Sequence, residues 1–528
     1  MRIFVRVKQC SNTIMAKLVS ADLTNGELCK LTYTTSDGEM LSLKGNAFDA
    51  KIISHSYTDK GVVIFDKPIT SIGEGAFAYC TSLINITIPD SVTSIGYNAF
   101  DGCKCLQHIF IGNKVSLIKS NAFYDCTSLQ NVYISDLSSW CKIDFESYCS
   151  NPLSNKAKLY LNEIEITEII IPEDIVEVKK AAFFGCCSLT DVTISNNVTL
   201  INDDCFACCE SLINVAISDS VTYIGKYAFL GCKNLQSVVI NNGVTTIDEG
   251  AFCQCRSLTS VSIPNSVSSI GNEAFEECYS LTSITIGNGV TSIGTSAFIF
   301  CDSLQSVYIS DLYAWCKINF ESGESNPLFY GASLYVSNVE IKEMDNLPDV
   351  TEIKQFAFRG CSSLAGVVIP DSVTKIGDEA FCNCNNLTRV IIGSSVTSIG
   401  KRAFEHCSIG TVICRSAIPP KLDEAFNLDM RTYSLTSFER FETLIVPIGR
   451  EEAYSNSDWG RYLREENVRY NRYNTVTSEA EECREKGHEA YYADYDNDAE
   501  YESYLALGGD PDKYESGCLD DYMDSIGL

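Results

Sequence analysis

Histidine is scarce in this chain of 528 residues, which contains only four. They are His55, His108, His406 and His488, and the sequences around them are unrelated. None stands at a recognisable spacing from a nucleophile and an acid that would orient it. The chain also lacks a phosphate loop, a nucleophile elbow, a zinc-protease motif and a dinucleotide fingerprint. The sequence therefore predicts no catalytic residue, no metal site and no cofactor, and a protein that is not an enzyme.

Basic residues and long apolar runs are also in short supply. The chain has 40 Lys and Arg against 69 Asp and Glu, a net charge of -29. Because phosphate backbones and anionic lipids repel an acidic protein, no nucleic-acid partner is expected. No apolar run reaches about 18 residues, so no membrane insertion is expected. The start, "MRIFVRVKQCSNTIMAKLVSADL", lacks the apolar core and cleavage site of a secretory signal, which by itself favours a cytoplasmic location.

Cysteine, by contrast, is abundant, with 26 residues. Twelve of them follow a Phe by three positions, and these Phe/Cys pairs recur at a constant interval that is interrupted only twice. A fixed period of this length marks stacked repeats, which bury their apolar stripes against one another. The pairs are Phe77/Cys80, Phe100/Cys103, Phe123/Cys126, Phe183/Cys186, Phe206/Cys209, Phe229/Cys232, Phe252/Cys255, Phe275/Cys278, Phe298/Cys301, Phe358/Cys361, Phe381/Cys384 and Phe404/Cys407.

Each unit reads A-F-x-x-C-x-x-L-x-x-[IV]-x-I-x-x-x-V-x-x-I-G. The alternation from Leu235 to Ile240 predicts a half-buried strand, and the segment from Val92 to Ile95 predicts a second, shorter one. Gly96 is expected to break the backbone before a single helical turn that carries Phe100 and Cys103 inward. The expected fold is a β-rich repeat solenoid with a parallel sheet and short helical turns.

The stretches "SVTSIGYNAFDGC" at 91–103 and "SVTYIGKYAFLGC" at 220–232 resemble the BspA-like leucine-rich repeats. The resemblance covers about residues 62–410 and implies a curved solenoid that binds other macromolecules, often as a surface adhesin. It predicts a β-rich N-terminal cap at 1–61, about 14 coils at 62–410 and a C-terminal cap at 411–476. Residues 477–528 form an acidic, tyrosine-rich tail, for which helices or disorder are expected.

The cysteines admit three interpretations. Buried, reduced thiols are favoured, because Cys packs as a small hydrophobe and members of the ladder belong to successive coils. Neighbouring coils would stand about 4.8 Å apart, which leaves some disulfides as an alternative. A zinc site needs four converging ligands, and a ladder spreads them along a line.

Two irregular units interrupt the period. The sequence "VYISDLSSWCKIDFES" at 132–147 returns as "VYISDLYAWCKINFES" at 307–322. This predicts a duplicated block with enlarged coils of about 37 residues near 123–159 and 298–334, each followed by a coil without the usual corner. Trp140 and its counterpart Trp315 are expected to seal the core there, with projecting binding knobs as the alternative.

The outward residues of the longer strand are predicted to form a concave binding face. Most are small and polar, and five stand out: His108, Phe110, Tyr133, Tyr308 and Arg389. Exposed aromatic and Arg side chains dominate interface energetics, although ordinary strand propensity also explains them. We expect a monomer that recognises a protein or glycan partner in adhesion at the cell surface. The alternative is an intracellular scaffold with an acidic docking tail.

Overall fold

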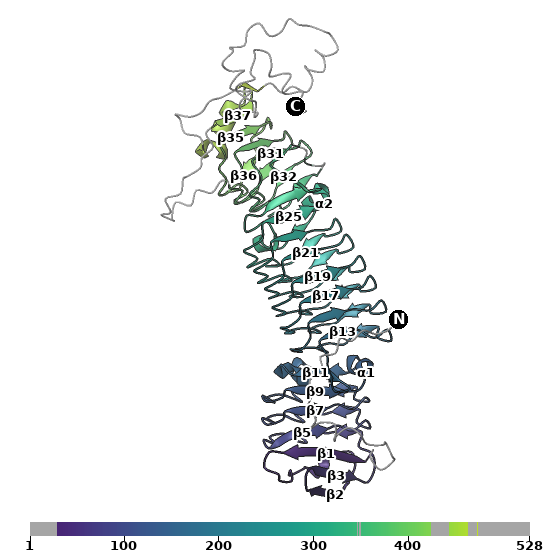
Figure 1. The fold of residues 1–528 in the computed structure, drawn as a ribbon. Coiled ribbons are helices and arrows are strands. Elements are labelled where there is room, and N and C mark those ends of the chain that lie inside the picture. The colour runs from purple at the N-terminus through teal and green to yellow at the C-terminus, as the bar shows by residue number, and fades with distance from the viewer. Residues whose placement is uncertain (1–28, 346, 348–349, 424–442, 463–471, 474–528) are drawn as a thin grey trace. The chain divides into compact units, whose positions relative to one another are not determined.

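The structure is a computed structural model that describes residues 29–345, 347, 350–423, 443–462 and 472–473. The chain divides into two compact units, Met1–Ser303 and Leu304–Leu528. Each unit is a parallel β-solenoid in which successive coils supply the rungs of a sheet (Figure 1). The predicted fold class is thereby confirmed.

The longer strands of successive coils pair in parallel, and the register advances by one repeat per coil, for example from Asn214 to Ser237. In the first unit these strands are divided among three sheets. The longer strands are β5 (Leu83–Thr87), β7 (His108–Phe110), β9 (Asn131–Ile134), β11 (Lys158–Leu161), β13 (Glu168–Ile170), β15 (Asp191–Thr193), β17 (Asn214–Ile217), β19 (Ser237–Ile240), β21 (Ser260–Ser262) and β23 (Ser283–Thr285).

The V-x-x-I segments form two-residue strands, which pair in parallel in two further sheets. These are β4 (Ser71–Ile72), β6 (Ser94–Ile95), β8 (Leu117–Ile118), β10 (Asp144–Phe145), β14 (Glu177–Val178), β16 (Leu200–Ile201), β18 (Tyr223–Ile224), β20 (Thr246–Ile247), β22 (Ser269–Ile270) and β24 (Ser292–Ile293). The residue that ends each segment is buried. It is Ile in every strand but β10 and β14, which end in Phe145 and Val178. Both predicted strands of the repeat are therefore present.

An antiparallel segment covers the first coil. It consists of β1 (Lys30–Thr35), β2 (Ile52–Tyr57) and β3 (Gly61–Phe65), with the 3-10 helix η1 (Gly45–Ala47) between β1 and β2. Strand β1 pairs antiparallel with β5. Phe48 packs against Phe77 at 6.0 Å between ring centroids and so closes the end of the phenylalanine column. The segment continues to Phe65 rather than stopping at residue 61, because the apolar alternation of β3 still pairs with β1.

The phenylalanines of the repeat form internal columns. In the first unit their neighbouring ring centroids lie 5.1 to 5.4 Å apart, with the ring planes within 10° of each other. The rings are at most 1% exposed. Such stacked pairs add about 0.5–1.5 kcal/mol each beyond the burial of their area. The predicted inward position of the Phe is therefore confirmed.

The corner that carries each Phe is a series of turns rather than the expected helical turn. Residues two before and two after the Phe are left-handed, as at Asn98 (φ 52°) and Gly102 (φ 69°) around Phe100. An α-helix does not continue through such residues. The backbone N–H groups of the Phe and of the left-handed residue after it donate to the next coil instead: Phe100 N lies 2.8 Å from Ala122 O and Gly102 N lies 2.9 Å from Tyr124 O. The corners thus form a third hydrogen-bonded ladder.

Gly96 does not break the backbone by a special φ angle, as the sequence suggested. A Cβ atom added there would lie 2.7 Å from the carbonyl carbon of Gly73 in the preceding coil. Glycine is needed because two coils approach closely at this point.

The repeat cysteines donate hydrogen bonds between coils. Cys103 Sγ lies 3.0 Å from Phe77 O, and Cys255 Sγ lies 3.3 Å from Phe229 O. The same bond recurs at seven more coils, at Cys126, Cys209, Cys232, Cys278, Cys301, Cys384 and Cys407. A small apolar side chain that also donates explains the preference for Cys over Ala. Cys80 belongs to the first coil and is partly exposed.

The first irregular unit differs from the predicted division. Asn131 of β9 pairs with Lys158 of β11, so this coil is shorter than the enlarged coil that the sequence predicts. A hairpin with β12 (Ile164–Glu165) then ends the sheet, and β13 begins another. The coil contains α1 (Leu137–Cys141), η2 (Tyr148–Ser150) and η3 (Pro152–Asn155). The prediction is wrong here because counting back from the next Phe gives no signal for a hairpin between two coils.

Trp140 seals the enlarged coil, as predicted, and is 1% exposed. Its Nε1 donates to Ala182 O at 3.0 Å, and Asn151 Nδ2 donates to Ala181 O at 2.7 Å. In a regular coil, the backbone N–H groups of the corner donate to carbonyl groups of the next coil. This coil lacks the regular corner, and the side chains of Trp140 and Asn151 donate in its place. In the second unit Trp315 donates in the same way to Ala357 O at 2.9 Å.

The second unit repeats this plan. Its strands and helices are β25 (Ser306–Ile309), α2 (Leu312–Cys316), β26 (Asn319–Phe320), η4 (Gly323–Ser325), β27 (Ser333–Val336), β28 (Val339–Glu340), β29 (Glu343–Met344), β30 (Glu352–Ile353), β31 (Gly366–Ile369), β32 (Lys375–Ile376), β33 (Arg389–Ile392), β34 (Ser398–Ile399), β35 (Thr411–Cys414), β36 (Lys421–Leu422), β37 (Thr443–Pro447), α3 (Glu451–Ser455), η5 (Asp458–Tyr462) and β38 (Arg472–Tyr473).

The parallel ladder of the second unit does not end at residue 410. Strands β35 and β37 extend it, because their β-branched residues continue the pairing of β33. Tyr454 Oη then donates to Ser416 O at 2.7 Å and Trp459 Nε1 to Pro420 O at 2.8 Å, which fastens the closing helices to the last coil. The tail at 477–528 lies outside the described residues, so its docking role stays a prediction.

Candidate binding surface

Alternate residues of the longer strands point outward. In β17 and β19 the exposed and buried positions alternate strictly. His108 and Phe110 lie on β7, Tyr133 on β9 and Tyr308 on β25, each in an outward position and partly exposed. These four residues therefore lie on the face for which the sequence predicts them.

Three aromatic rings on the outward face of the first unit form a stack. The centroids of Phe110 and Tyr133 lie 4.4 Å apart with an angle of 11° between the rings, and Tyr133 and Tyr160 lie 4.9 Å apart at 29°. The rings therefore face along the ladder, and their edges face solvent. Tyr160 was not among the predicted site residues. The strand-like stretch "KLYL" at 158–161 is the signal that could have found it.

A row of polar side chains lies beside this stack. Asn131 Nδ2 donates to His108 Nδ1 at 3.1 Å and to Tyr133 Oη at 3.1 Å. On the next strands Asn85 Nδ2 donates to Thr34 Oγ1 at 2.6 Å. Burial lowers the pKa of His108, so its imidazole is neutral at pH 7. Burial likewise raises the pKa of Tyr133, which remains a hydroxyl donor.

The far end of the stack carries charge. Tyr160 Oη donates to Glu165 Oε2 at 3.4 Å, and Lys158 Nζ lies 2.9 Å from Glu165 Oε1. These residues belong to the hairpin of β11 and β12, where the sheet ends. The surface therefore runs from a charged edge at β12 to a neutral region at β7 and β5.

The second unit retains part of this arrangement. Tyr308 and Tyr335, the counterparts of Tyr133 and Tyr160 in the duplicated block, stack at 4.8 Å and 28°. A pair of stacked tyrosines is thus common to both irregular coils.

Arg389 also belongs to the second unit, and it is not a free cation. Its side chain is 17% exposed, and its Nη2 lies 2.9 Å from Glu343 Oε2. The next outward position, Ile391, is fully buried, so both faces of β33 are covered there. Arg389 is therefore less available to a partner than its residue type suggests.

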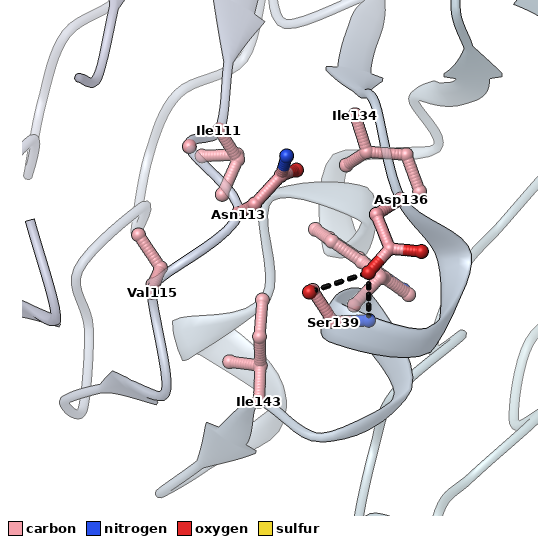
Figure 2. A pocket seen from close by; sticks show the side chains of 9 residues that line it. Ile111, Asn113, Val115, Ile134, Asp136, Ser139 and Ile143 are labelled. Atoms are coloured by element: carbon pink, nitrogen blue, oxygen red, sulfur yellow. Dashed lines mark hydrogen bonds between the residues drawn. The ribbon is translucent and has the colours of Figure 1, made fainter. Parts of the chain in front are cut away.

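A small pocket lies against α1 (Figure 2). Its lining includes Ile111, Ile134 and Ile143, and Asp136 Oδ2 accepts from the backbone N–H of Ser139 at 3.0 Å as the helix cap. The cavity volume is about 10 Å³, which is about the space of one water molecule. The pocket is therefore too small to bind a cofactor or substrate.

Clustered metal ligands are missing from the residues that the structure describes. Within those ranges, no group of three or more His, Cys, Asp and Glu side chains is arranged to hold a metal ion. No helix in the same ranges is long and apolar enough to cross a membrane. The aromatic and polar rows are thus the candidate site that the described residues offer.

Comparison with known families decides the identity of the repeat. The family model described as "BspA type Leucine rich repeat region (6 copies)" matches residues 54–156, 153–267, 227–322 and 331–443. The chain belongs to the BspA-type leucine-rich repeat family. Leucine-rich repeat proteins bind protein partners, and BspA-type solenoids are typically not catalytic. No curated protein matches the chain.

Several solved structures resemble this BspA-type protein. A leucine-rich repeat protein from Bacteroides ovatus is 22% identical, with a TM-score of 0.46, and the match covers 79% of this chain and 90% of that one. A leucine-rich cell surface protein from Faecalibacterium prausnitzii is 24% identical, with a TM-score of 0.32 and coverage of 68% and 94%. The pneumococcal vaccine antigen PcpA is 15% identical, with a TM-score of 0.33 and coverage of 83% and 99%.

Proposed function

We propose that this BspA-type protein is a non-catalytic recognition protein that binds a macromolecular partner in adhesion. The partner is a protein or a glycan, and it binds the outward face of β5, β7, β9 and β11. The observation that carries this proposal is the stack of Phe110, Tyr133 and Tyr160 on a face whose other outward residues are mostly small and polar.

Energetics favour this face as the site of contact. Aromatic residues are enriched among the few side chains that supply most binding energy at an interface. The stacked rings are held in place by their neighbours and by Asn131, so they lose little freedom when a partner binds. A rigid aromatic stripe therefore provides affinity at low entropic cost.

The short-strand face is less suited to this role. Its exposed hydroxyls already donate to the preceding coil, as at Thr222 Oγ1, 3.2 Å from Thr199 O, and Thr245 Oγ1, 3.0 Å from Thr222 O. These groups bind the coils to one another and leave fewer donors for a partner.

The proposal is tested by screening the full chain on protein and glycan arrays and measuring the hits by biolayer interferometry. The double variant Tyr133→Ala/Tyr160→Ala should weaken binding at least tenfold. The matched control Ser237→Ala/Ser260→Ala, on outward positions of the same unit, should leave it unchanged. Retained affinity in the tyrosine variant would contradict the proposed face. A parallel variant, Tyr308→Ala/Tyr335→Ala, reports whether the second unit also binds.

A further inference from the structure

The aromatic stack has an open end at Phe110. One face of this ring is covered by Tyr133, and the other is directed toward β5. There the register places Thr87 opposite Phe110, and Thr87 is exposed. A threonine is much shorter than a ring, so the stack ends in a step.

The dimensions of the step follow from the ladder itself. Neighbouring strands are about 4.8 Å apart, and the rings of the stack are 4.4 and 4.9 Å apart. A further ring laid against Phe110 would therefore lie directly over Thr87. The next strand, β1, places Thr32 beside Thr87. These residues form a shelf about two strands wide, which we call the Phe110 shelf. Phe110 is its wall, and Thr87 and Thr32 are its floor.

We propose that the Phe110 shelf binds a neutral pyranose ring of a glycan, which stacks on Phe110 as the next member of the aromatic ladder. This inference rests on the proposed function and names the ligand class of the same face. The C–H groups of a pyranose suit the electron-rich face of an aromatic ring, and its hydroxyls can pair with the hydroxyls of the floor.

The composition of the shelf favours a sugar over a protein side chain. An aromatic side chain of a protein would cover the hydroxyls of Thr87 and Thr32 without pairing them, and unpaired buried hydroxyls cost free energy. The row beside the shelf is uncharged: it consists of Thr34, Asn85 and His108, and burial lowers the pKa of that imidazole. Lys30, at the outward position two residues before Thr32 on β1, is a charged side chain on the same face.

Asn85 lies beside the shelf. It lies on β5 on the same face as Thr87, two residues away. Its Nδ2 donates to Thr34, whereas its Oδ1 is buried without a hydrogen-bond partner within the described part of the chain.

The test uses the full chain on an array of neutral oligosaccharides, followed by isothermal titration with the free oligosaccharide that gives the strongest signal. Phe110→Ala removes the wall, and Phe110→Trp restores an aromatic face. Thr87→Tyr fills the shelf with a ring of the protein itself. Thr193→Tyr adds the same ring at an exposed outward position of β15 and serves as the matched control.

Wild type, Phe110→Trp and Thr193→Tyr should bind the oligosaccharide with affinities within about threefold of one another, since all three keep the shelf. Phe110→Ala should bind at least tenfold more weakly, and Thr87→Tyr should not bind. The inference is overturned if no oligosaccharide binds, or if binding survives in Thr87→Tyr. A protein partner whose binding is lost in the tyrosine double variant would uphold the proposed function while the glycan inference fails.

Discussion

Removing one ring from the internal column should be far more costly than removing a side chain from the outward face. Phe229 is fully buried, 5.4 Å from Phe206 and 5.2 Å from Phe252 between ring centroids. Phe229→Ala deletes a buried ring and leaves a cavity, which costs about 3–5 kcal/mol. Because two stacked pairs are lost together, we expect a value near the upper end. Ser237→Ala, on the outward face of β19, should stay within about 0.5 kcal/mol.

Urea unfolding followed by circular dichroism measures both variants. A lower midpoint at an unchanged slope indicates lost stability rather than a changed unfolded state. Phe229→Leu keeps most of the volume and should lose less than Phe229→Ala. Equal midpoints for Phe229→Ala and Ser237→Ala would refute the assignment of inward and outward positions.

Three further predictions concern the contacts between coils. Gly271→Ala places a Cβ atom 2.5 Å from the backbone of the preceding coil and should cost about 1–3 kcal/mol, measured by thermal melting. Gly410→Ala, whose nearest atom would be 3.9 Å away, should melt within a few degrees of wild type. Trp140→Phe removes the donor to Ala182 and should cost about 1–2 kcal/mol in urea titration. Burial raises the pKa of Cys126 from 9.0 to about 12, so the folded state holds this proton more tightly. The contribution of this thiol to stability should therefore be constant below pH 9 and be lost as the pH rises toward 12, whereas a profile that stays flat between pH 9 and 12, measured by denaturation at each pH, would contradict a buried thiol ladder.

The period and the burial pattern could be read from the sequence because each apolar position recurs in register. Phe229 and Cys232 were assigned inward positions from spacing alone, and both are fully buried. The left-handed corner residues carried no such signal, since Tyr227, Gln254 and Glu273 occupy equivalent strained positions. Polar, aromatic and small side chains all occur there, because the bonds between coils use only the backbone.

The candidate site was predicted only in part. Phe110 and Tyr133 stood out as large side chains at outward positions, but Tyr160 follows a coil of altered length, where counting by the repeat period fails. Arg389 was expected to face a partner because its type is common at interfaces, whereas its ion pair with Glu343 joins two strands that are far apart in the sequence. Contacts of that kind are set by register and not by local pattern.

Thiol reactivity under native conditions tests the central claim most directly. The full chain is exposed to an alkylating reagent, with and without denaturant, and each cysteine is scored by mass spectrometry. Buried Cys232, Cys255 and Cys278 should react only after unfolding, while partly exposed Cys105 and Cys149 should react at once. Rapid labelling of the first three residues in the folded protein would contradict an internal ladder of thiols beside the phenylalanine columns.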